Sequence, residues 1–90
     1  MNLQINSKAL KDLRSFDRKK SIRILEEITS LKNYPNVSNI TKLTNFKPSY
    51  RKRVGNYRVL FEIDDNEIIV YRILHRKESY KSQLQNYLGM

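Results

Sequence analysis

The 90-residue chain has no cysteine, no tryptophan and a single histidine, which limits the sites it can build. Without cysteine it has neither a disulfide nor a thiolate metal site, and a lone histidine argues against zinc. No apolar run approaches the roughly 20 residues that span a bilayer, and the N-terminus lacks the apolar core of a signal peptide. We therefore expect one cytoplasmic domain, residues 1–90, with no metal, no small-molecule cofactor and no membrane partner.

Acidic residues are scarce relative to basic ones. Nine Asp and Glu stand against eighteen Lys and Arg, which gives a formal net charge of +9. In so short a chain this excess favours a polyanionic partner, with nucleic acid first and an acidic protein or anionic membrane second. Charge alone does not indicate the fold or the chemistry.

The stretch 50–80 predicts three strands joined by two tight turns. Gly55 and Asn56 separate two β-prone runs and can take the positive φ angles of a two-residue hairpin turn. If these two residues form the loop, Arg53 lies directly opposite Arg58 on the neighbouring strand. The first turn therefore fixes the register on which the rest of the interpretation depends.

Side chains alternate between the two faces of a strand. With the register above, three arginines share one face, which we call the arginine face: Arg51, Arg53 and Arg58. Lys52 falls on the opposite face by the same alternation.

The second predicted turn is Asp64–Glu67, whose residues bond readily to their own backbone. It pairs Ile63 with Ile68 and sets Arg58 against Ile73, so His75 is expected on the arginine face. The other face is the more apolar and should be the core side. Its predicted members are Val59, Phe61, Ile63, Ile68, Val70 and Leu74.

Two helices are predicted before these strands, after a short strand over Asn2–Asn6. Ser7 and Asp17 are the expected N-caps, and the second helix should end near Lys32. The apolar residues that recur at helical spacing are Ala9, Leu10, Leu13, Phe16, Ile24, Leu25, Ile28 and Leu31.

The segment 37–49 has no regular pattern, and Ile40, Leu43 and Phe46 are its expected anchors on the core. The element order is therefore β-α-α-β-β-β. This order predicts an α+β fold in which a helical hairpin packs on one face of a small, mostly antiparallel twisted sheet. The first strand lies at an edge or beside the last strand.

A solvent-facing group of arginines could bind an RNA backbone, because guanidinium groups hold phosphate oxygens in a bidentate manner and stay protonated. Metal-free RNA cleavage needs a base for the ribose 2′-hydroxyl, cations for the extra negative charge, and an acid for the leaving oxygen. His75 and Tyr80 are the only non-cationic candidates for proton transfer near the arginines. Composition alone leaves a second interpretation open, in which the arginines simply form a solvated or partner-binding face.

Two segments carry a resemblance to a known family. They are Tyr50–Val59, YRKRVGNYRV, and Ile73–Tyr80, ILHRKESY. Together with the element order, they resemble the RelE branch of the RelE/ParE superfamily of toxin-antitoxin toxins, which commonly shows YRxRVGxYRV and HRxxxY. The resemblance covers almost the whole chain and implies a RelE-like fold.

The resemblance implies a toxin that enters the ribosomal A site and cuts mRNA, without metal, leaving a 2′,3′-cyclic phosphate. It also implies a cognate antitoxin, whose acidic segment would suit the +9 charge. Arg58 resembles the arginine that stabilises the scissile phosphate, Arg76 an acid or phosphate ligand, and Tyr80 the base. His75 matches members in which a histidine shares proton transfer. The phosphate-binding strand would supply Arg51, Lys52 and Arg53.

Two other functions remain open at this point. One is a ParE-like gyrase inhibitor, although that branch generally lacks the His-Arg…Tyr ending that is present here. The other is a non-enzymatic RNA- or ribosome-binding module, for which Tyr71 is the only aromatic platform expected on the arginine face.

Overall fold

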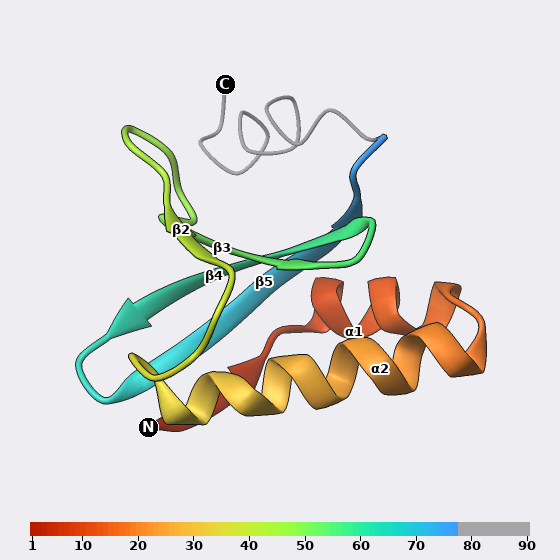
Figure 1. Cartoon of the computed structure of the whole chain (residues 1–90), viewed down its shortest axis with the longest axis horizontal. Helices are drawn as coiled ribbons and strands as arrows, with labels where there is room; N and C mark the ends of the chain where they lie inside the picture. The colour runs from red at the N-terminus through yellow and green to blue at the C-terminus, as the bar shows by residue number, and fades with distance from the viewer. Residues whose placement is uncertain (78–90) are drawn as a thin grey trace.

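Five strands form one sheet that two helices cover on a single side (Figure 1), in a computed structural model that describes residues 1–77. The strand order is β1-β5-β4-β3-β2; β1 runs parallel to β5, and all other pairs are antiparallel. The elements are β1 (Asn2–Ile5), α1 (Ser7–Ser15), α2 (Arg18–Thr29), the 3₁₀ helix η1 (Ser30–Asn33), β2 (Ile40–Lys42), β3 (Tyr50–Val54), β4 (Tyr57–Asp64) and β5 (Glu67–His75). The predicted α+β class is confirmed, and β2 is an addition from the segment expected to be irregular.

The caps of the two helices agree with the sequence at one position and differ at the other. The carboxylate of Asp17 accepts from the Lys20 N–H at 3.0 Å, as predicted for the N-cap of α2. At α1, however, the side chain of Asn6 accepts from the Ala9 N–H at 3.0 Å, and Ser7 is already the first helical residue. Asn and Ser cap equally well, so sequence preference alone does not separate neighbouring candidates.

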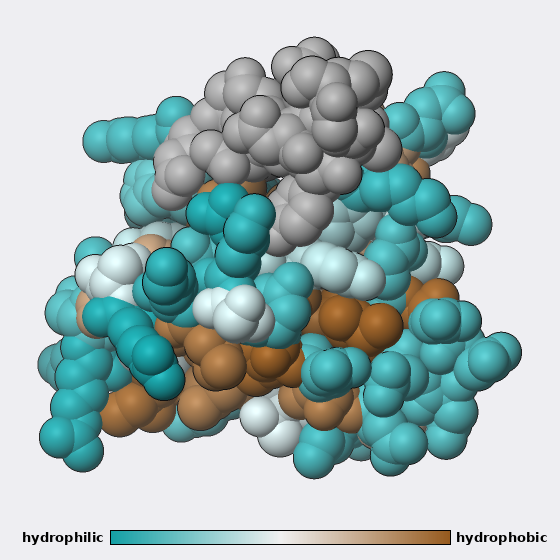
Figure 2. Space-filling view, turned by 180° about the vertical axis from the view of Figure 1, so that it is seen from behind, coloured by the Kyte–Doolittle hydropathy of each residue, from teal (hydrophilic) through white to brown (hydrophobic). Residues whose placement is uncertain are grey.

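The main core lies between the helices and the sheet. Figure 2, seen from behind, shows a band of hydrophobic residues across the lower half of the molecule. The apolar helix residues predicted to face the core do so, except that Leu10 and Leu25 are 39% and 44% exposed. Neither helix within residues 1–77 has the length and apolar composition of a membrane span. The buried members of this core are Ala9, Leu13, Ile24, Ile28, Leu31, Val54, Val59, Phe61, Ile68, Val70 and Ile73.

A bulge in β5 changes the predicted register of its second half. Ile68 pairs with Ile63 as expected, but the register shifts beyond Phe61, and Tyr71 is the extra residue. Arg58 therefore faces Leu74 rather than Ile73. Because one inserted residue reverses which side chains face the core, the predicted faces of the residues after the bulge are wrong.

Asp12 of α1 holds this part of β5 at the point where β1 has ended. Its carboxylate accepts from the Ile73 N–H at 2.8 Å, which satisfies a donor on the uncovered strand edge. The same carboxylate binds the guanidinium of Arg72 through Nε at 2.8 Å and Nη2 at 3.1 Å. Arg72 is thus tied to α1 beside the bulge.

The bulge also creates a small second core on the face away from the helices. Leu60 and Leu74 are buried there, and Leu43 and Phe46 pack against them. Leu43 and Phe46 therefore anchor the β2–β3 connection as predicted, but on the arginine face, whereas Ile40 packs against the main core.

Candidate phosphate-binding site

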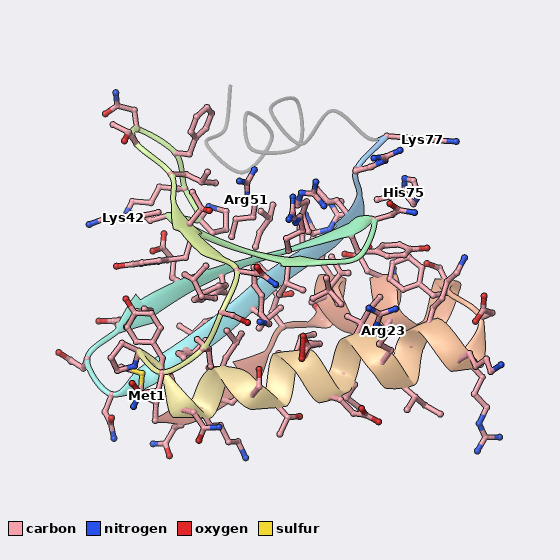
Figure 3. All side chains as sticks on the ribbon, viewed as in Figure 1. Met1, Arg23, Lys42, Arg51, His75 and Lys77 are labelled. Carbon is pink, nitrogen blue, oxygen red and sulfur yellow. The ribbon has the colours of Figure 1, made fainter. Side chains whose placement is uncertain are left out.

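The arginine face exists as the sequence predicts. Arg53 and Arg58 are direct cross-strand partners in β3 and β4, and Arg51 lies opposite Leu60. The register follows from the two-residue turn, in which Gly55 has φ +57°. Figure 3 shows Arg51 projecting from the sheet on the side away from the helices.

The two opposed arginines differ in their surroundings. Arg53 is exposed, whereas Arg58 is half-buried, and its Nη1 donates to the Tyr57 carbonyl at 3.1 Å and the Gly55 carbonyl at 3.5 Å. These bonds hold the Arg58 guanidinium over the β3–β4 turn. Like charges directly opposite each other on adjacent strands are unfavourable, so an anion bound between Arg53 and Arg58 would stabilise the site.

The backbone brings Arg76 to the same turn. Its N–H donates to the Asn56 carbonyl at 2.7 Å, which extends the β4–β5 pairing by one residue. Arg76 is exposed, and continued alternation from β5 places it on the side of Leu74 and Arg58. The structure thus joins Arg76 to the predicted arginines, although they lie far apart in the sequence.

His75 does not lie on the arginine face, contrary to the prediction. It pairs with Tyr57, and its ring meets the Tyr57 ring edge-on at 5.1 Å on the helix side of the sheet. The bulge at Tyr71 is the physical cause, because it inverts the alternation of β5. His75 Nδ1 accepts from the Lys77 N–H at 3.0 Å, and both residues lie at the end of β5 (Figure 3).

The geometry of Lys52 does not suit the phosphate-binding role predicted for it. Lys52 is 1% exposed and points to the helix side of β3, where its Nζ donates to the Ser38 carbonyl at 2.9 Å. Glu27 Oε1 of α2 lies 3.9 Å from the same ammonium. Lys52 is therefore a buried link between α2, β3 and the segment before β2, as strand alternation alone had indicated.

Tyr80, the predicted base, lies outside the described residues. Within residues 1–77, no three His, Cys, Asp or Glu side chains converge as metal ligands.

The arginine face continues past the second core into a cavity of about 440 Å³. Its lining includes Pro48, Glu62, Ile69 and Tyr71. Strand alternation predicted Tyr71 as an aromatic on this face, but the sequence carries no functional signal at Glu62, because a lone acidic residue in a basic chain matches no motif. The structure supplies that signal, because Glu62 lines the same cavity as Tyr71 and Ile69.

Comparisons with known proteins identify the family. Residues 3–80 match a family model described as the ParE toxin of the type II toxin-antitoxin system parDE. The chain is 36% identical over 74 residues to toxin RelE3 of Methanocaldococcus jannaschii, an alignment that covers 81% of this chain and 84% of that toxin.

Solved structures agree with the sequence comparisons. The RelB-RelE antitoxin-toxin complex from Methanococcus jannaschii gives a TM-score of 0.71 at 30% identity, over 88% of this chain and 96% of the matched chain. The isolated E. coli RelE toxin gives a TM-score of 0.68 over 96% of this chain and 97% of that one, and at 17% identity it supports the fold alone. The resemblance inferred from the two motifs is confirmed, and the chain belongs to the RelE/ParE superfamily as a toxin of a type II toxin-antitoxin system.

Proposed function

We propose that this toxin is an endoribonuclease that cleaves mRNA in the ribosomal A site without a metal ion. The cleavage would be a transesterification within the message. The ribose 2′-oxygen loses its proton to a base and attacks the adjacent phosphorus, and the bond from phosphorus to the 5′-oxygen breaks. An acid protonates that oxygen, so the products are a 2′,3′-cyclic phosphate and a 5′-hydroxyl.

The arginines supply the charge stabilisation that this reaction needs. The pentacoordinate phosphorane carries more negative charge than the phosphodiester, and fixed cations that are already in place stabilise it selectively. Arg58 is assigned to the scissile phosphate because two backbone carbonyls hold its guanidinium above the turn. Arg51 and Arg53 bind the flanking phosphates from the neighbouring strand.

Proton transfer is assigned to the end of the chain beyond β5. Arg76 is the acid or a further phosphate ligand, and Tyr80 is the base. A tyrosine ordinarily titrates near pH 10, so this role would need arginines beside the phenol that lower its pKa by favouring the phenolate. His75 is assigned a supporting role instead. Its Nδ1 accepts from the Lys77 N–H, and this bond spans Arg76 in the sequence and so orients the segment that carries it.

One observation carries the proposal: Arg53, Arg58 and Arg76, from three separate parts of the sequence, gather at the β3–β4 turn, with Arg51 further along β3 on the same face. Arg53 and Arg58 are direct cross-strand partners despite their like charge. The backbone N–H of Arg76 donates to the carbonyl of the turn residue Asn56 at 2.7 Å. Positive charges gathered on one surface in this way favour the binding of a polyanion. An mRNA backbone is a polyanion of the required kind.

A cognate antitoxin is the second proposed partner. The matched complex from Methanococcus jannaschii is described as a toxin bound to its antitoxin RelB. For this chain, an antitoxin with an acidic segment over the arginine face would neutralise the cations that bind mRNA. Inhibition would then follow from occupation of the phosphate site itself.

The proposal is tested by inducing the toxin in cells and mapping the 5′ ends of a translated message by primer extension. Wild type should arrest growth and produce new ends within codons, whereas Arg58→Ala should do neither at equal expression. Unchanged growth arrest and unchanged ends with Arg58→Ala would contradict the assignment. A ParE-like gyrase inhibitor would instead cause DNA damage and leave the message intact.

A further inference from the structure

The cavity beside Glu62 lies on the same face as the arginines but at the opposite end of β4. At about 440 Å³ it falls within the usual size of small-ligand sites. Glu62 and Ile69 are cross-strand partners that line it together, and the bulge residue Tyr71 adds an aromatic side chain. Pro48 supplies a buried apolar wall.

The Glu62 carboxylate is fixed in one orientation. Its Oε2 accepts from the Ser49 N–H at 2.9 Å and the Ser49 hydroxyl at 3.1 Å, and Lys47 Nζ lies 3.8 Å away. Among residues 1–77, no group donates to the second oxygen, Oε1. A half-buried carboxylate with one oxygen saturated leaves the other available to a ligand that donates a hydrogen bond.

We propose that this cavity binds one nucleobase of the message and selects bases that carry an exocyclic amino group. The inference rests on the proposed function, because the arginine face must first bind the RNA backbone. Tyr71 provides a surface for stacking, and an ionised carboxylate only accepts hydrogen bonds. Adenine, cytosine and guanine present amino donors to such a group, as in the pairing of Glu with the cytosine amino group. Uracil has no amino group.

The spacing between Arg58 and Glu62 along β4 suits one bound strand of RNA. Glu62 follows Arg58 by four residues on the same face, a distance of about 13 Å at 3.3 Å per residue. Stacked nucleotides advance about 3.4 Å each, so the selected base lies within about four nucleotides of the phosphate held by Arg58. Phe46 and Leu43 form the surface between the two points. The cavity would thus read a base in or next to the codon that is cut.

The test is an NMR titration of the full chain with 2′-O-methyl trinucleotides AAA, CCC, GGG and UUU, which lack the attacking hydroxyl. The amino-bearing trinucleotides should shift the backbone amides of Glu62, Ile69 and Tyr71, and UUU should bind at least about fivefold more weakly. Glu62→Gln places an amide donor in the cavity and should abolish this preference. Asp65→Asn is the matched control, because it makes the same change in the exposed turn at φ 54°, which Asn tolerates.

A second variant keeps the inference testable if Glu62→Gln does not fold. Tyr71→Leu should weaken the binding of all four trinucleotides by about 5- to 150-fold, the scale of one lost stacking contact. Amides of the cavity that do not move, or a preference against UUU that survives Glu62→Gln, would overturn the inference.

The outcomes separate this inference from the proposed function. Shifts confined to Arg51, Arg53 and Arg58 would contradict the base site and leave the nuclease proposal standing. Base-selective shifts at the cavity, in a toxin that leaves messages intact, would contradict the nuclease proposal and support the base site. If Glu62→Gln weakens only the antitoxin complex, the cavity binds an antitoxin side chain instead, and the inference is wrong.

Discussion

The two faces of the sheet use cations in opposite ways. Lys52 and Arg53 are neighbours in β3, yet Lys52 is 1% exposed on the helix side and Arg53 is exposed on the other. The Lys52 ammonium is satisfied by the Ser38 carbonyl and Glu27. Arg53 instead lies opposite another cation, Arg58. Burial and partners, rather than the type of residue, therefore distinguish a structural cation from one that serves a ligand.

The comparison also shows why the arginine face can change without loss of the fold. Most of the buried apolar side chains are on the helix side, and the arginine face holds only the small cluster of Leu60 and Leu74. Substitutions on the helix side should therefore change stability, and those among the arginines should change activity.

The largest expected effect on stability is from Phe61→Ala on the helix side. Phe61 is fully buried between β4 and the helices, so its truncation should lower the free energy of unfolding by about 3–5 kcal/mol. Urea denaturation measures this change. Ile22→Ala is the control, because Ile22 is 47% exposed and should cost far less; equal losses would contradict the placement of the core.

The pair Lys52→Met and Arg53→Met tests the comparison most closely, because adjacent cations are changed to the same residue. Lys52→Met leaves the Ser38 carbonyl without its donor and should lower the free energy of unfolding by about 1–3 kcal/mol. Cleavage per folded molecule should stay unchanged. Arg53→Met should reduce cleavage and leave stability the same or slightly higher, because a like-charge pair is removed. Denaturation and ribosomal cleavage assays on both variants measure these effects. A loss of cleavage in Lys52→Met together with a loss of stability in Arg53→Met would contradict the assignment of the two faces.

Asp12→Asn tests the link between α1 and the edge of β5. Asn can still accept from the Ile73 N–H but lacks the charge that binds Arg72. We expect a loss of about 1–1.5 kcal/mol in unfolding free energy, together with faster hydrogen exchange at Ile73. Exchange at Ile73 that matches wild type would show that Asp12 does not hold the bulge.

The smallest expected effect is that of magnesium. If the arginines alone neutralise the transition state, the cleavage rate should stay constant as free Mg²⁺ rises above the concentration that keeps ribosomes intact. Single-turnover cleavage at several Mg²⁺ concentrations measures this dependence. A rate that increases in proportion to added Mg²⁺ would contradict a reaction performed by protein cations.

Much of the fold and part of the site could be predicted because they follow from local rules. The Gly55–Asn56 turn fixes the β3–β4 register, so the shared face of Arg51, Arg53 and Arg58 was predictable. The bulge at Tyr71 was not predictable, because the contact beside it joins the Ile73 N–H to the carboxylate of Asp12, which lies 61 residues before Ile73 in the sequence. The wrong face predicted for His75 follows directly from the extra residue, Tyr71, which the predicted register did not include.

The remaining differences also have long-range causes. β2 is three residues long and forms only because it pairs with β3, so its own sequence carries no strand signal. Glu62 became a candidate only when the fold placed Ser49 and Tyr71 beside it. Local patterns predict elements and turns, whereas contacts between residues distant in the sequence become visible only in the folded structure.

The most direct test of the central claim is single-turnover cleavage of a defined message on purified ribosomes, with wild type, Arg58→Ala and Arg14→Ala. The two variants lose the same charge, but Arg14 is exposed on α1, away from the arginine face. We predict that Arg58→Ala lowers the cleavage rate constant by at least about 100-fold, the scale for one lost transition-state donor, with an unchanged melting temperature. Arg14→Ala should match wild type. An Arg58→Ala protein that is folded and cleaves at the wild-type rate would contradict the account.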